Sequence, residues 1–142
     1  MTCPGSDGSD KGQQLTVEPK KQGGDYWNQQ WSWAGTRLDR LECRHNESRS
    51  VGSGKDELYV AVKEEGSDNG AKVIMWPANS QGDKPTWQSQ NWTMVGENIV
   101  NACGLLLSTK GDGGAGSKVH LWEDVGAQNQ DWERDHLNKV QV

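Results

Sequence analysis

The sequence predicts an all-β domain built from three internal repeats that close into a threefold barrel. The tripeptide Gln-x-Trp occurs three times, each time after a β-rich segment, although the Gln and Trp content would give less than one match by chance. Short β-branched runs alternate with Gly/Asp/Ser/Asn clusters, and no long helical period appears. When Glu18 is aligned with Trp122, the first unit begins inside its opening strand. The two ends of the chain are then expected to lie close together, as a closed barrel requires.

The first unit is expected to contain strands at 14–18, 26–33 and 37–44. Residues 5–12 read as a loop because they contain only Gly, Ser, Asp and Lys. The segment from His45 to Lys55 is polar and rich in Gly and Ser, which predicts the longest loop of the domain.

The second and third units continue the alternation of strands and turns. We expect their strands at 57–63, 72–76, 98–102, 105–109, 118–123, 131–134 and 137–142. Four strands in each unit give about twelve in all. The chain has the length of one domain, so we expect a single domain over 1–142, with repeats at roughly 1–54, 55–101 and 102–142.

Charge and hydropathy exclude some classes of partner. The net charge of -5 and the absence of a Lys/Arg-rich run argue against nucleic acid, which needs a basic surface. No apolar stretch is long enough to cross a membrane, so we expect no membrane insertion. The first residues lack the charged and apolar regions of a signal peptide, and the compartment stays open between the cytoplasm and the outside of the cell.

The chain has three cysteines, Cys3, Cys43 and Cys103, and none is part of a CxxC pair. We expect buried free thiols, with Cys43 and Cys103 on equivalent strands because each follows a Gln-x-Trp at a similar distance. The glycosylation sequons at Asn46 and Asn91 matter only if the protein is secreted.

The segment Val119-His120-Leu121-Trp122, followed by Asn129-Gln130-Asp131-Trp132, resembles the motif of the ricin B-type β-trefoil lectins. The resemblance extends over nearly the whole chain. It implies a β-trefoil with a six-stranded barrel, a hairpin cap and up to three shallow sugar sites, commonly for galactose or N-acetylgalactosamine. In such a site an aromatic ring stacks on the apolar face of the sugar, and amides and a carboxylate hold its hydroxyls.

In unit three, the resemblance implies that Trp122 stacks on the sugar, that His120 takes the polar strand position, and that Asn129 and Gln130 supply the amides. The family normally has an Asp at the position where this chain has Ser108. The usual specificity of the family therefore does not carry over directly.

Units two and one retain less of the family pattern. Unit two has Trp76, Ser89 and Gln90, with Ala61 at the acid position. Unit one has Asn28 and Gln29, with Pro4 at the acid position and Glu18 in place of the ring. We therefore rank the sites in the order three, two, one.

Each unit has an acid shortly after the vacant acid position, namely Asp7, Glu65 and Asp112. One interpretation is that the sugar-binding carboxylate has moved into the following turn. The other is that these are ordinary turn residues, since turns select Asp and Gly. A calcium loop is a third interpretation, but its ordered ligand spacing is absent, so we expect no metal and no cofactor.

The Gln and Trp of each Gln-x-Trp have a second interpretation, in which they serve the core and its hydrogen bonding rather than the sugar. This applies to Gln29, Gln90, Gln130, Trp31, Trp92 and Trp132.

No Ser/His/Asp or Cys/His set is recognisable, so we expect a binding protein rather than an enzyme. Its expected partners are glycans of cell-surface glycoproteins or glycolipids. Tryptophans such as Trp27, Trp33 and Trp87 would offer exposed apolar surface, and with shallow sites this favours a homo-oligomer. The alternative is a trefoil that binds protein, such as a protease inhibitor acting through the loop at 45–55.

Overall fold

The computed structural model describes residues 1–2, 12–19, 29, 31–34, 40–43, 58–77, 88–111 and 113–132. The elements in this part are eight strands and two 3-10 turns, in two four-stranded antiparallel sheets of order β1-β2-β3-β4 and β5-β6-β7-β8. They are β1 (Trp31–Ala34), β2 (Arg40–Cys43), β3 (Leu58–Val62), η3 (Lys63–Glu65), β4 (Val73–Pro77), β5 (Trp92–Val95), β6 (Asn98–Asn101), β7 (Leu106–Thr109), β8 (Val119–Trp122) and η4 (Gln128–Gln130). The prediction of an all-β fold is confirmed for the described part.

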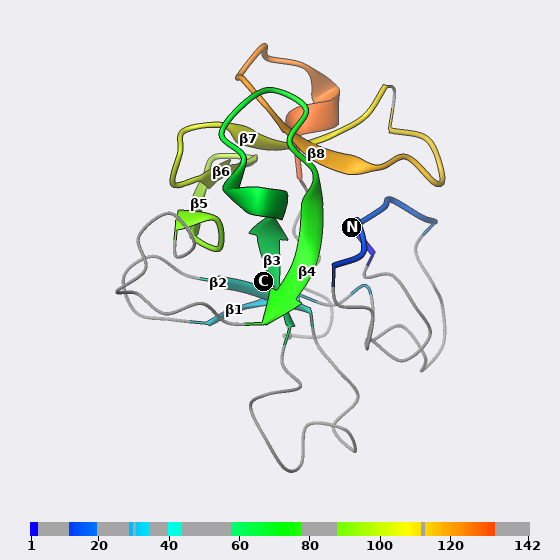
Figure 1. Ribbon diagram of the computed structural model, residues 1–142. Helices are drawn as coiled ribbons and strands as arrows, with labels where there is room; N and C mark the ends of the chain where they lie inside the picture. The colour runs from blue at the N-terminus through cyan, green and yellow to red at the C-terminus, as the bar shows by residue number, and fades with distance from the viewer. Residues whose placement is uncertain are drawn as a thin grey trace.

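The two sheets are built in the same way. Each begins at the Trp of a Gln-x-Trp, Trp31 or Trp92, and ends on the strand that carries Trp76 or Trp122. In Figure 1 the β3–β4 hairpin stands in the centre, with β7 and β8 above it and β1 and β2 across its base. Each sheet therefore joins the end of one repeat to the strands of the next.

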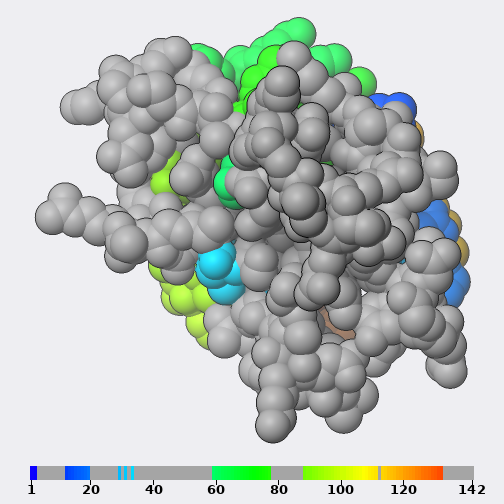
Figure 2. Space-filling view, turned by 90° about the horizontal axis from the view of Figure 1, so that it is seen from below, coloured from blue at the N-terminus to red at the C-terminus, as the bar shows by residue number. Residues whose placement is uncertain are grey.

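Three equivalent segments close the fold around a pseudo-threefold axis, each bonded to the next in cyclic order. The glycine bonds are Gly12 N–H to Met75 O (2.7 Å), Gly70 N–H to Leu121 O (2.8 Å) and Gly116 N–H to Val17 O (2.6 Å). These glycines have φ of +87°, +90° and +83°, a region that glycine enters without steric cost. In Figure 2 the segment 12–19 (blue) lies at the right edge and the chain just after residue 88 (yellow-green) at the lower left, with β3 and β4 (green) at the top.

The core lies on this axis, where Leu15, Val73 and Val119 are fully buried. The Gln-x-Trp tryptophans surround it, and each indole N–H donates to a backbone carbonyl of a strand packed beside it. The acceptors are Met1 O for Trp31 (3.0 Å), Val60 O for Trp92 (2.9 Å) and Leu107 O for Trp132 (2.9 Å). These rings are structural, because the fold uses both their volume and their single donor.

Some of the predicted strands differ from the structure. Residues 14–18 pair on both sides through isolated bridges rather than a continuous ladder. Asp131 and Trp132 are not in a strand, and 137–142 lies outside the described residues. A strand that we did not predict, β5, follows directly from Trp92, since the Gly96-Glu97 turn (Gly96 φ +60°) folds it onto β6.

Three predictions about the cysteines and Trp33 were wrong. Cys103 is an exposed free thiol in the turn after β6, not a buried one. Cys43 pairs with Trp31 across β1 and β2, and Asn101 pairs with Trp92 across β5 and β6. Cys43 is therefore equivalent to Asn101, not to Cys103. Trp33 is half-buried against the core rather than exposed, while Trp27, Trp87 and Cys3 lie outside the described residues.

Candidate functional site

The unit-three pocket has a volume of about 290 Å³ and lies between β7, β8 and η4. Four of its lining residues were predicted from the sequence as site residues, and the other four were not. Its lining residues are Thr109, Gly111, His120, Trp122, Val125, Ala127, Asn129 and Gln130.

Trp122 forms an aromatic wall of this pocket. Its side chain is 37% exposed, and the His120 ring stacks on it with centroids 5.5 Å apart and planes 27° from parallel. A Cβ atom placed on Gly70, from unit two, would lie 3.9 Å from the ring, so the neighbouring unit supports the wall. Burial, and then the nearby Lys110 ammonium, lowers the pKa of His120 below its usual value, which keeps the imidazole neutral to a lower pH.

Two buried oxygen atoms of this pocket have no hydrogen-bond partner among the described residues. The Asn129 amide donates to Thr109 O (2.7 Å) and Gly111 O (3.3 Å), which leaves its Oδ1 unpaired. Thr109 is 5% exposed, and its Oγ1 is unpaired as well. Buried polar atoms are nearly always paired, so these two oxygens are exceptions within the described residues.

Gln130 and Ser108 have structural roles, although Gln130 also lines the pocket. The Gln130 amide donates to Glu123 O (2.7 Å) and Ser108 Oγ (3.3 Å), and its Oε1 accepts from Val125 N–H (3.0 Å). Ser108 is fully buried and donates to Leu106 O, and it does not line the pocket. Its neighbour Thr109 is among the lining residues instead.

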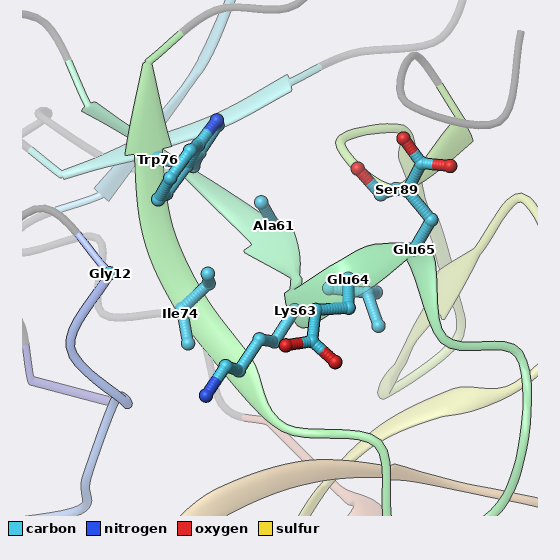
Figure 3. Close-up of a pocket in the computed structure, with 9 residues that line it drawn as sticks. Gly12, Ala61, Lys63, Glu64, Glu65, Ile74, Trp76 and Ser89 are labelled. Atoms are coloured by element: carbon cyan, nitrogen blue, oxygen red, sulfur yellow. The ribbon is translucent and has the colours of Figure 1, made fainter.

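The unit-two pocket has a volume of about 300 Å³ and occupies the equivalent place beside β3 and β4. Trp76 lines it with the same 37% exposure as Trp122. Glu65 lines it too, and Figure 3 shows the Glu65 side chain directed toward Ser89, with Ala61 between Glu65 and Trp76. Gln90 is fully buried, bonds Pro77 O (2.7 Å) and Trp76 O (3.3 Å), and is not among the lining residues.

In unit one, Gln29 repeats the structural bonds of its equivalents. Its amide donates to Pro19 O (3.0 Å) and Thr2 Oγ1 (3.2 Å), as Gln130 does to Glu123 O and Ser108 Oγ. Thr2 therefore occupies the acid position, and our alignment of Pro4 there was wrong. The reason is turn length: Thr2 pairs with Thr16 and Ser108 with His120, so the connection in unit one is two residues longer.

The remaining predicted site residues, Asn28, Asp7 and Asp112, lie outside the described residues. The described part contains no group of three His, Cys, Asp or Glu side chains placed to hold a metal ion. Within the same ranges, no helix is both long enough and apolar enough to cross a membrane.

Sequence reasoning missed the supporting glycines and Thr109. A signal for the glycines was present, because Gly12, Gly70 and Gly116 each stand six residues before the ring position of their own unit. In the fold each faces the ring position of the next unit: Gly12 faces Trp76, Gly70 faces Trp122, and Gly116 faces Glu18. No sequence signal identified Thr109 as a lining residue.

Two solved structures are similar to this chain over most of its length. A designed threefold-symmetric protein, ThreeFoil, is 22% identical with a TM-score of 0.66, covering 88% of this chain and 82% of the designed one. The C-terminal domain of an earthworm lectin, as a mutant in complex with 6'-sialyllactose, is 16% identical with a TM-score of 0.61, covering 92% and 84%. No protein-family model and no curated protein sequence matches the chain. Together with the cyclic hydrogen bonds of the three units, these similarities show a β-trefoil fold.

Proposed function

We propose that this chain is a carbohydrate-binding lectin, without catalytic activity, whose principal site is the unit-three pocket. The observation that carries the proposal is the exposed Trp122 ring, stacked with His120, in one pocket with Asn129. A pyranose presents C–H groups on one face and hydroxyl groups at its rim. It would cover the ring with its C–H face and direct its hydroxyls to the polar side chains of the pocket.

A galactose-type glycan is the ligand that we propose first. The resemblance to ricin B-type lectins favours galactose or N-acetylgalactosamine, and the similar earthworm domain was crystallised with 6'-sialyllactose. The family's Asp is absent here, and Ser108 at that position is buried and bonded to Gln130. The polar side chains that line the pocket, His120 and Asn129, would hold the sugar hydroxyls in its place.

Cross-linking of glycans would require more than one chain. Unit one has the exposed Glu18 at the ring position, and the unit-two pocket has Ile74 at the position of His120 in unit three. One sugar site in each chain gives little avidity, so we propose a homo-oligomer that presents several sites to one surface. Light scattering should then give a mass above 15.7 kDa.

The deciding experiment is a glycan array on the purified protein, followed by calorimetry with lactose. We expect binding to galactose-terminated glycans that free lactose competes away. An array without glycan binding would contradict the proposal. Inhibition of a protease would instead favour the alternative of a protein-binding trefoil, whose loop at 45–55 lies outside the described residues.

A further inference from the structure

The unit-two pocket differs in chemistry from its unit-three equivalent, although both have a Trp wall and nearly equal volume. The hydrogen bonds of Trp92 and Trp132 make Val60 equivalent to Leu107. It follows that Val62 replaces Thr109. By the strand register Ile74 replaces His120, since Ala61 pairs with Ile74 as Ser108 pairs with His120.

The floor of this pocket is therefore apolar. Ala61, Val62 and Ile74 line it, and each is at most 4% exposed. A sugar hydroxyl placed against this floor would meet no hydrogen-bond partner there, and an unpaired buried hydroxyl is unfavourable. The pocket instead suits a ligand with a compact hydrocarbon body.

The rim of the pocket is acidic. Glu64 and Glu65 stand where unit three has Gly111 and Asp112, and Lys63 stands where it has Lys110. Among the described residues of the rim, two carboxylates and one ammonium give a formal charge of -1. Figure 3 shows the Lys63 ammonium and the Glu65 carboxylate directed to opposite sides of the pocket. Glu64 has a φ of +53° where unit three has Gly111 at +69°, so an acid occupies a backbone position better suited to glycine.

We propose that the unit-two pocket binds a small organic ammonium ion, an alkylammonium or arylalkylammonium, independently of sugar binding in unit three. The hydrocarbon part covers Ala61, Val62 and Ile74. The positive charge lies between the Trp76 ring, which attracts cations through its π-face, and the Glu65 carboxylate. A chain with both pockets occupied would bind two ligands of different chemistry.

Calorimetry with phenethylammonium tests this proposal, since an alkylamine is fully charged near pH 7. The neutral 2-phenylethanol has a similar shape and measures the hydrocarbon contribution alone. We expect the cation to bind at least about fivefold more tightly than the alcohol, with the difference shrinking as salt is added. Equal affinity of the two compounds, or no binding of either, would overturn the proposal.

Single substitutions show whether phenethylammonium binds in the unit-two pocket. Trp76→Ala should abolish phenethylammonium binding, and the conservative Glu65→Gln should remove the preference for the cation. Trp122→Ala is the matched control, because Trp122 is equally exposed at the equivalent position, and it should leave phenethylammonium binding unchanged. Thermal unfolding of each variant separates a lost site from a lost fold. Loss of phenethylammonium binding in Trp122→Ala, or its survival in folded Trp76→Ala, would refute the assignment.

Discussion

The substitution Trp122→Ala tests the sugar site most directly, because it removes the stacking wall. A Trp side chain offers up to about 250 Å² of surface, so the 37% exposed here leaves roughly 90 Å² for a ligand to cover. At about 25 cal/mol per Å², covering that surface contributes roughly 2 kcal/mol. This corresponds to a loss of roughly thirtyfold in lactose affinity.

The assay is calorimetric titration of wild type, Trp122→Ala and the matched Trp76→Ala with lactose. Trp122 is partly exposed, so the substitution should destabilise the fold by less than the roughly 3 to 5 kcal/mol of a fully buried Trp. Urea unfolding verifies that the variant is folded at the titration temperature. Unchanged lactose affinity in Trp122→Ala, or an equal loss in Trp76→Ala, would show that our placement of the sugar is wrong.

Three further predictions concern stability. Trp92→Phe removes the indole N–H that donates to the buried Val60 carbonyl, so the free energy of unfolding in urea should fall by about 1 to 3 kcal/mol. The control Thr93→Ala, on the exposed side of the same strand, should change this free energy little. The pKa of His120 is lowered in the folded state, so on acidification the unfolded chain binds the proton first. The free energy of unfolding should therefore drop as the pH falls from about 6.5 through the folded-state pKa. The substitution His120→Gln should remove this drop when the urea midpoint is measured against pH. Gly70→Ala meets no steric clash but forces a φ of +90° on Ala, which should lower the free energy of unfolding by about 1 to 3 kcal/mol, and an unchanged thermal midpoint would contradict the strain argument.

The sequence by itself determined the repeat and the side chains that build it. Gln and Trp recur in each unit because each has one local structural role. The Gln amide donates to the carbonyl just after the ring position, and the Trp indole donates to the neighbouring strand. Local roles of this kind leave a motif in the sequence. The same motif predicted that Trp76 and Trp122 occupy equivalent positions, and the structure gives them equal exposure.

Only the tertiary structure decided which side chains line the pockets. The acid position of unit one is Thr2 rather than Pro4, because a connection two residues longer shifts the pairing, and a gapless alignment cannot detect that change. Thr109 lines the unit-three pocket while Ser108 is buried against Gln130, and the sequence alone could not assign these two roles. Gly70 belongs to unit two but supports the Trp122 wall of unit three. The barrel brings these residues together through hydrogen bonds between repeats, and contacts between distant segments leave no local pattern in the chain.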